Sequence, residues 1–195
     1  DMGRTIMNHG QPDIRTCFPR NSYIWHPAEF PYFERVSNSF VFFRKCFELK
    51  DPEAAVLELF AHTRYALWIN GNYVARGPCR SDPTWTYFDR LEITQHLRGG
   101  TNVFALMVVY HGYGTGQSVD VMRGLWASAT IRERDGDKVH IQSDDTWTCS
   151  LAEAWEREAP RVNGRQGPIE IIDQRKHPEG WQDPDFDDRH WPTAK

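Results

Sequence analysis

The chain has 195 residues, 13% of them aromatic, and a formal net charge of −4. That length suits one large β domain, which at this size buries about 70% of its unfolded surface without needing covalent staples. The negative charge and the lack of a basic run exclude a nucleic-acid partner, because such a partner rewards clustered Lys and Arg. No stretch approaches the roughly 20 apolar residues of a membrane span. We therefore expect a soluble chain that binds neither nucleic acid nor membrane.

Four cysteines are spread widely along the chain, at Cys17, Cys46, Cys79 and Cys149, and no C-x-x-C pair occurs. A zinc site therefore has little support, and no cofactor is expected. Reduced thiols in a cytoplasm and one or two long-range disulfides both fit this spacing. We favour reduced thiols, and with them a cytoplasmic over a secreted location, because a domain of this size needs no staples.

The N-terminal part begins with a polar segment, residues 1–22, which we interpret as an irregular leader. Between Ser39 and Leu49 apolar residues alternate with charged ones such as Arg44 and Glu48. Side chains of a strand point alternately to its two faces, so this pattern predicts a half-buried strand. The same alternation repeats over 56–61.

Two hairpins are predicted next, each from a turn dipeptide between apolar runs. Asn70-Gly71 and Asp135-Gly136 tolerate the positive φ angles of a type I′ turn, whose twist matches a hairpin. Between them, residues 103–110 are apolar on both faces, which predicts a central strand that is covered twice. A further strand is expected around Trp147.

Helical signals are limited to short turns at 93–97 and 151–158. Many short strands with Gly and Asn turns predict an all-β fold, a jelly-roll β-sandwich over residues 23–166. The segment 167–195, rich in Pro, Asp and Trp, is expected to be an extended strap over the sandwich.

One glycine-rich loop, His111 to Gly116, follows a predicted strand. A phosphate cradle needs such a loop to open a helix, so that amide dipoles converge on the anion. The residues after Gly116 do not look helical, so we interpret the loop as a mobile connection. Its His111 and Tyr113 could still touch a ligand at one end of the sandwich.

An acidic run, Asp183 to Asp188, superficially resembles a calcium loop. The helix-loop-helix calcium pattern requires Gly at the sixth position and an acidic residue at the twelfth, and this run supplies neither. A structural calcium held by backbone carbonyls and one carboxylate remains the alternative. We expect instead that Phe186 and Trp191 anchor the strap while the carboxylates face water.

No catalytic residues are predicted. With 27 acidic residues the sequence singles out no pair of carboxylates that could flank a glycosidic bond, and it contains no G-x-S-x-G elbow.

The best candidate ligand cluster is the segment with Arg80, Asp82, Trp85 and Tyr87. Aromatic side chains stack on the C–H faces of pyranoses, and Arg and Asp hydrogen-bond vicinal hydroxyls, so the cluster suits a carbohydrate. The alternative is that Tyr87 points inward and Arg80 pairs with Asp82.

An ordered series of short motifs extends through the chain from Tyr23 to Trp191. It consists of Tyr23-Ile24-Trp25-His26-Pro27, Phe43-Arg44-Lys45-Cys46-Phe47, Ile69-Asn70-Gly71 with Gly77-Pro78, the Asp89 to Val103 turn, Ser143-Asp144-Asp145-Thr146-Trp147, Asp173-Gln174-Arg175, Gly180-Trp181, Phe186-Asp187-Asp188 and Trp191. Together these motifs resemble the N-terminal β-sandwich region of bacterial α-L-rhamnosidase-like glycoside hydrolases. Gln174 stands where that family would have a small residue. The strand-and-turn half also resembles the galactose-binding-like sandwiches of β-galactosidase-like enzymes, whereas the strap favours the rhamnosidases.

The resemblance implies that terminal α-L-rhamnosides are hydrolysed with inversion in a separate (α/α)₆ barrel, toward which the strap would lead. No catalytic residue can be carried onto this sequence, because the barrel's acidic residues do the chemistry. The implied role is a non-catalytic accessory domain that packs on the barrel and can help to shape the substrate site. An autonomous carbohydrate-binding module for rhamnose-containing sugars and a purely structural domain remain as alternatives.

Overall fold

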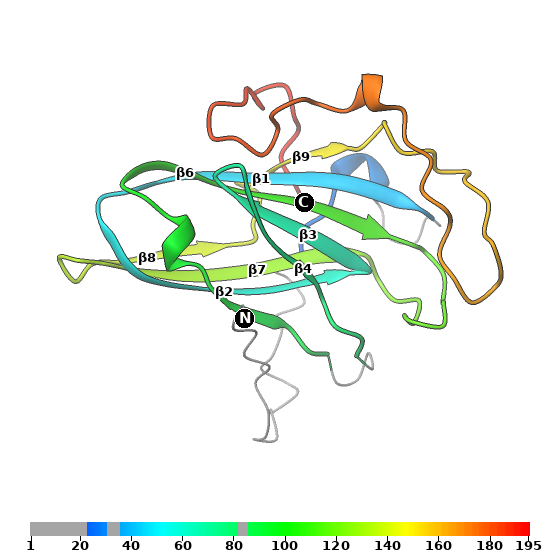
Figure 1. The fold of residues 1–195 in the computed structure, drawn as a ribbon, viewed down its shortest axis with the longest axis horizontal. Helices are drawn as coiled ribbons and strands as arrows, with labels where there is room; N and C mark the ends of the chain where they lie inside the picture. Colours follow the sequence, from blue (N-terminus) through cyan, green and yellow to red (C-terminus); the bar gives the residue numbers. More distant parts are fainter. Residues whose placement is uncertain (1–22, 31–35, 82–85) are drawn as a thin grey trace.

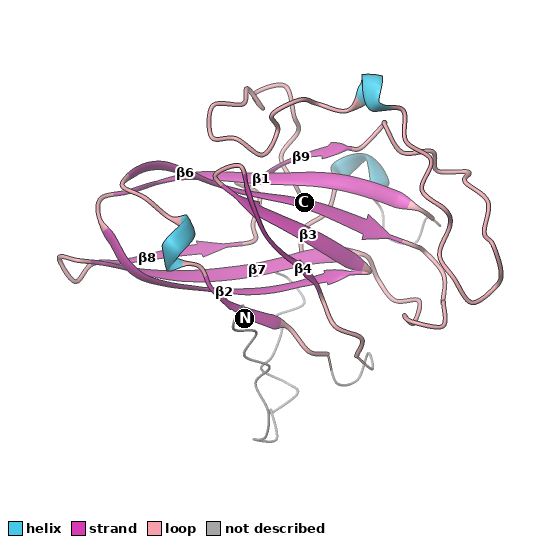
Figure 2. Cartoon of the chain, in the orientation of Figure 1, coloured by secondary structure: helices cyan, strands magenta, loops and turns pink. Residues whose placement is uncertain are grey.

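The computed structural model describes residues 23–30, 36–81 and 86–195 and shows a sandwich of two antiparallel sheets (Figure 1, Figure 2). The five-stranded sheet has the order β4-β3-β6-β1-β9 and the four-stranded sheet the order β5-β2-β7-β8. The strands are β1 (Ser39–Leu49), β2 (Pro52–His62), β3 (Arg64–Ile69), β4 (Asn72–Gly77), β5 (Asp89–Glu92), β6 (Gly100–Tyr110), β7 (Gly124–Glu133), β8 (Lys138–Gln142) and β9 (Thr148–Leu151), with short 3₁₀ helices η2 (Pro27–Glu29), η3 (Thr94–His96) and η4 (Gln174–Lys176). The all-β sandwich expected from the sequence is therefore confirmed.

The main core lies between the two sheets and follows from the alternation of apolar residues. Val41 and Phe43 of β1 point inward and are fully buried against Phe104 and Leu106 of β6. β1 pairs with β6 over its whole length, from Ser39 opposite Tyr110 to Leu49 opposite Gly100. β6 lies in the middle of its sheet, as its apolar character on both faces predicted.

Both predicted hairpins are present. Asn70 and Gly71, between β3 and β4, have φ angles of 51° and 79°, as a type I′ turn requires. The hairpin of β7 and β8 turns at residues 134–137, where Gly136 has a φ of 94°.

At 93–97 a single 3₁₀ turn forms as expected, but the helical turns predicted at 151–158 are wrong. There β9 ends at Leu151 and the chain turns so that Trp155 stacks on Phe40, with ring centroids 5.4 Å apart.

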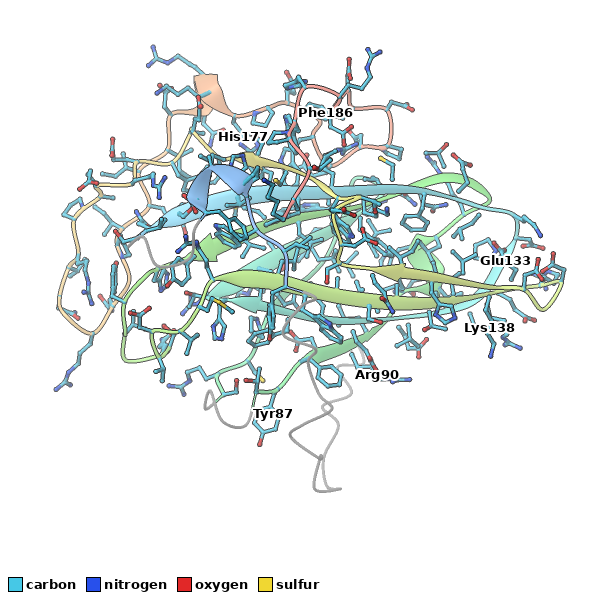
Figure 3. The ribbon with its side chains drawn as sticks, turned by 180° about the vertical axis from the view of Figure 1, so that it is seen from behind. Tyr87, Arg90, Glu133, Lys138, His177 and Phe186 are labelled. Carbon is cyan, nitrogen blue, oxygen red and sulfur yellow. The ribbon has the colours of Figure 1, made fainter. Side chains whose placement is uncertain are left out.

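The outer face of the five-stranded sheet is covered by the C-terminal segment (Figure 1). Phe42 of β1 is buried there against Trp181, with ring centroids 4.3 Å apart, and lies 6.1 Å from the ring of Trp191. This second aromatic cluster explains why β6 is apolar on both faces, because each face is removed from water by a different layer. Figure 3 shows His177 and Phe186 on this side of the sandwich.

The expectation that the carboxylates of the 183–188 run face water is wrong for Asp188. Its carboxylate accepts a hydrogen bond from Nε of Arg44 at 2.9 Å and another from the hydroxyl of Thr148 at 2.8 Å. The guanidinium of Arg44 is buried under the segment and needs a counter-charge, so the acidic residue is drawn inward. Trp191 anchors the segment as expected, and Trp181 is more deeply buried.

Candidate ligand-binding end of the sandwich

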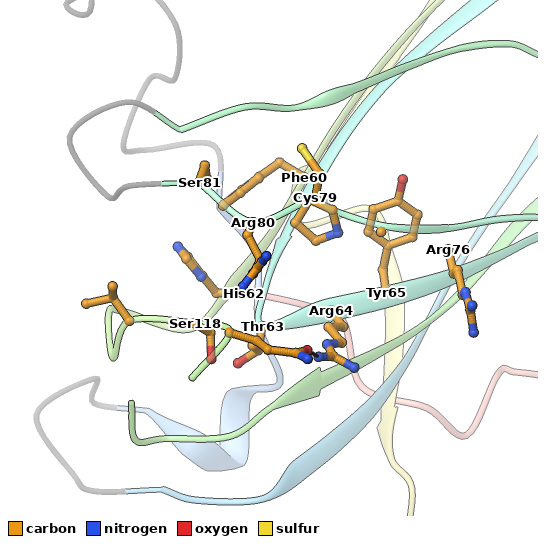
Figure 4. A pocket seen from close by; sticks show the side chains of 14 residues that line it. Phe60, His62, Thr63, Arg64, Tyr65, Arg76, Cys79, Arg80, Ser81 and Ser118 are labelled. Carbon is orange, nitrogen blue, oxygen red and sulfur yellow. Dashed lines mark hydrogen bonds between the residues drawn. The ribbon is translucent and has the colours of Figure 1, made fainter. Parts of the chain in front are cut away.

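A pocket of about 500 Å³ opens at one end of the sandwich, where β2 passes over to β3 (Figure 4). Its walls come from the end of β2, the start of β3, the end of β4 with the segment after it, and the loop that follows β6. Pockets of this size can hold a small-molecule ligand. The lining residues are Phe60, His62, Thr63, Arg64, Tyr65, Arg76, Gly77, Pro78, Cys79, Arg80, Ser81, Gln117, Ser118 and Val119.

Three arginines surround this first pocket. Arg64 starts β3, Arg76 lies in β4 and Arg80 in the segment after β4, so three parts of the chain each contribute an arginine to the lining; in Figure 4 Arg76 lies apart from the other two, beyond Tyr65. The Nη2 atom of Arg64 donates a hydrogen bond to the side-chain oxygen of Gln117. No described carboxylate forms an ion pair with Arg64 or Arg80.

His62 contributes a neutral imidazole to the same pocket. Burial lowers the pKa of His62 from 6.5 to about 4, because the charged form loses its hydration there. The ring packs edge-on against Phe60, with centroids 4.8 Å apart. At neutral pH the positive charge of the pocket therefore comes from its arginines, and His62 offers one donor and one acceptor.

A second pocket of about 350 Å³ adjoins the first and shares Arg64 and Gln117 with it. Its wall includes His111, Arg165 and Glu170. The pKa of His111 is lowered, first by burial and then by the neighbouring charges of Arg64 and Arg161, while Glu170 acts in the opposite direction. The hydrogen-bonded side chains of Arg64 and Gln117 thus separate two polar subsites.

The ring of His111 stacks on Tyr113 at 6.1 Å, and the guanidinium of Arg161 lies 4.1 Å from the centre of the Tyr113 ring. Cation–π contact of this kind holds a guanidinium without neutralising it. The glycine-rich loop is therefore stacked against the segment that follows β9, and Tyr113 supports the second pocket from behind His111 rather than lining it.

The predicted site residues are only partly brought together. Arg80 lines the first pocket and His111 the second. Tyr87 is 50% exposed and lines neither pocket, so the alternative that it points inward is wrong; Figure 3 shows it directed away from the sandwich. Asp82 and Trp85 lie outside the described residues, and with them any pairing of Arg80 with Asp82.

Sequence reasoning missed Arg64, Arg76, His62 and Gln117. The available signal was the polar run His62-Thr63-Arg64 between two strongly apolar strands. Such an interruption marks the point where the chain crosses from one sheet to the other, and loops at that point carry binding residues more often than strands do.

Several motif residues have structural roles within the sandwich. Asn102 is fully buried, and its side-chain oxygen accepts hydrogen bonds from Nδ2 of Asn70 at 2.8 Å and from the amide of Arg98 at 3.1 Å. The hydroxyl of Thr94 accepts from the amide of Ala55 at 2.7 Å. Buried polar groups must be paired in this way, so these side chains fix the turns of the fold.

Cysteines and possible metal ligands were located within the described residues. Within 23–30, 36–81 and 86–195 no three His, Cys, Asp or Glu side chains gather as metal ligands would. Cys46, Cys79 and Cys149 are free thiols, and burial raises the pKa of Cys149 to about 12. No helix of the described chain is both long and apolar enough to cross a membrane.

A family model, the α-L-rhamnosidase N-terminal domain, matches residues 50–195. The chain belongs to this family. An α-L-rhamnosidase of Streptomyces avermitilis is 23% identical over 177 residues, which are 90% of this chain and 14% of that protein. The resemblance to rhamnosidases expected from the motifs is thereby confirmed.

Solved structures agree with this rhamnosidase family. The GH78 family rhamnosidase of Bacillus sp. GL1 is 32% identical, with a TM-score of 0.78 over 90% of this chain and 18% of that one. A lectin from Pleurotus ostreatus, solved in complex with GalNAc, shares the fold at 20% identity and a TM-score of 0.59, over 90% of this chain and 41% of that one. The chain spans between 14% and 21% of the length of the rhamnosidases it matches.

Proposed function

We propose that the chain is the non-catalytic N-terminal accessory domain of an α-L-rhamnosidase, and that the hydrolysis of terminal α-L-rhamnosides takes place in an (α/α)₆ barrel elsewhere in that enzyme. The observation that carries this proposal is the family match over residues 50–195, together with the 14% and 18% of the rhamnosidase lengths that the chain covers. A scaffold role agrees with the hydrogen bonds within the sandwich that the side chains of Asn70, Thr94 and Asn102 form.

A projecting hairpin supplies the surface for the barrel. Residues 155–172, which we call the apolar hairpin, are held together by bridges between Trp155 and Ile172 and between Arg161 and Pro168. Val162 at its tip is 72% exposed, and Ile169, Ile171 and Ile172 are exposed as well. Grouped apolar side chains on a surface mark a contact with another protein part, and here that part is the catalytic domain of the same enzyme.

The test compares the full-length rhamnosidase with a variant carrying Ile171→Asp and Ile172→Asp, at two exposed hairpin residues that line neither pocket. We expect a lower Tm and a lower kcat/KM for an aryl α-L-rhamnoside, because two side chains that the barrel would bury become charged. Met122→Asp, at an exposed apolar residue outside the hairpin, is the control. If the double variant matches the control in both quantities, the barrel does not pack on this hairpin.

Carbohydrate binding is the second candidate function, favoured by the two adjoining polar pockets. A calorimetric titration of the 195-residue chain with L-rhamnose and rhamnose-containing oligosaccharides, with galactosides as controls, tests it. Saturable heat that disappears in Arg80→Gln supports a binding module. Absence of heat at millimolar ligand leaves the accessory role alone.

A further inference from the structure

The described residues that line the two pockets carry more positive than negative charge, although the whole chain is acidic. The chain has 27 Asp and Glu against 23 Lys and Arg. Yet the described residues that line the two pockets include the four arginines Arg64, Arg76, Arg80 and Arg165 and a single carboxylate, Glu170. That carboxylate already accepts a hydrogen bond from the indole of Trp155 at 3.0 Å. A concave surface lined by one sign of charge concentrates ligands of the opposite sign.

We propose that these pockets bind an anionic carbohydrate, whose carboxylate, or a phosphate or sulfate ester in its place, is held between Arg64 and Arg80. The planar guanidinium presents its N–H groups as a fork that matches the two oxygens of a carboxylate. Arg64 is already oriented by its hydrogen bond to Gln117. The described residues hold no carboxylate paired with either arginine, so an anion would meet two available charges.

The shape of the site favours a sugar over a bare anion. A small anion needs one tight cradle, whereas here two pockets of about 500 and 350 Å³ meet at the pair of Arg64 and Gln117. The first pocket also presents groups suited to hydroxyls: the neutral imidazole of His62 and the side chains of Thr63 and Ser118. An acidic sugar would place its anion on the arginines and its hydroxyls on these groups. The inference rests on the carbohydrate-binding function proposed above and names the class of its ligand.

The test is a titration of the 195-residue chain at low ionic strength with D-galacturonate and, as a matched neutral ligand, D-galactose. The two differ only in the carboxylate at C6. We expect saturable binding of galacturonate, with amide shifts in the NMR spectrum confined to the pocket segments, and little or no binding of galactose. Galactose 6-phosphate, galactose 6-sulfate and inorganic phosphate are the further arms. Added salt should weaken binding, because the pocket is open and its charges are screened.

Arg64→Gln and Arg80→Gln should each weaken galacturonate binding by about tenfold or more, the loss expected for a hydrogen bond between charged groups. Arg175→Gln removes one charge from an exposed arginine that pairs with Asp173 outside the pockets and should bind as the unchanged chain does. Cys79 lies in the pocket wall and is exposed. Galacturonate should slow the alkylation of Cys79. This protection reports that the first pocket is occupied, and it is measured on the chain without any substitution.

Each outcome decides the proposal. The proposal is supported if galacturonate, galactose 6-phosphate or galactose 6-sulfate binds and this binding is lost in Arg64→Gln or Arg80→Gln. The ligand that binds identifies the anion. Equal binding of galactose, equal binding of inorganic phosphate, no binding at millimolar ligand, or an equal loss in Arg175→Gln overturns it. None of these negative results would contradict the accessory role, which is tested separately by substitutions in the apolar hairpin of the full-length enzyme.

Discussion

The guanidinium of Arg44, in the middle of β1, lies 2.9 Å from the carboxylate of Asp188, which is 144 residues further along the chain. The Arg44 side chain is buried, and its Nη1 atom also donates to the backbone carbonyls of Trp181 and Asp183, the latter at 3.1 Å. One charged side chain on the outer face of the sheet therefore holds three points of the C-terminal segment. Without that segment the same arginine would lie on an exposed strand.

Replacing Asp188 with Ala should lower the free energy of unfolding by about 2–3 kcal/mol, because the buried guanidinium of Arg44 loses its counter-charge. Urea unfolding followed by tryptophan fluorescence measures the change. Asp187→Ala is the matched control: this neighbour pairs with Arg189 at the exposed surface, so its loss should leave stability nearly unchanged. Equal stability of the two variants would mean that Arg44 does not depend on Asp188.

The hairpin tip at Gly71 provides a second test of how the C-terminal segment is docked. Its amide donates to the carbonyl of Gln182 at 3.0 Å, and an added Cβ would lie 2.3 Å from Oδ1 of Asp183. At Gly136, also with positive φ, an added Cβ meets nothing within 4 Å. Both Gly→Ala changes impose a left-handed residue, at a cost of about 1–2 kcal/mol each. Asp183 is exposed and its carboxylate can rotate away, so Gly71→Ala should exceed Gly136→Ala by less than about 1 kcal/mol.

A double-mutant cycle separates the clash at Gly71 from the backbone strain. In an Asp183→Ala background the carboxylate that obstructs the new Cβ is gone, so the excess cost of Gly71→Ala should vanish. Thermal or urea unfolding of the four proteins gives the coupling energy. If the excess persists in this background, it comes from the hairpin itself and not from its contact with the C-terminal segment.

Stability should fall on acidification, in part through His62. Its pKa is 6.5 in the unfolded chain and is lowered to about 4 by burial in the fold, so between these values the unfolded state binds the extra proton. The contribution of His62 is therefore complete at neutral pH and should decline by up to about 2 kcal/mol between about pH 7 and 5. Urea unfolding at several pH values measures this slope. His62→Gln should flatten the slope, although His26, His96, His111 and His177, whose pKa values are also lowered, keep part of it.

Thiol labelling distinguishes Cys79 from Cys149. Cys79 is exposed in the wall of the first pocket, whereas Cys149 is buried and burial raises its pKa to about 12. The thiolate is the reactive form, so an alkylating reagent at neutral pH should modify Cys79 in the native chain and Cys149 only after unfolding. Peptide mass spectrometry gives the two rates, and Cys79→Ser confirms the assignment. Comparable native rates would show that Cys149 is accessible.

Local patterns in the sequence were sufficient for the strands and the turns. The alternation in β1, the doubly apolar run in β6 and the dipeptides Asn70-Gly71 and Asp135-Gly136 all report local backbone geometry, and each was read correctly. The family could also be recognised from the sequence, because its motifs consist of turn residues and buried polar residues, such as Asn102, whose spacing the fold requires. The helical turns expected at 151–158 do not form; there Trp155 stacks on Phe40, which is distant in the sequence and leaves no signal in the local pattern.

The class of the fold, its turns and its relatives could be predicted, since they depend on residues close together in the chain. The positions of the charged residues depend instead on contacts between distant segments. The alternation in β1 placed Arg44 among the charged residues of a half-buried strand, and it is buried because the segment with Asp188, 144 residues further along, covers that face. Arg64, Arg76 and Arg80 belong to separate segments, and they surround one pocket because the crossover between the sheets and the end of β4 meet at the same end of the sandwich. Contacts between residues that are distant in sequence leave no periodic pattern in it, so no local pattern could have predicted them.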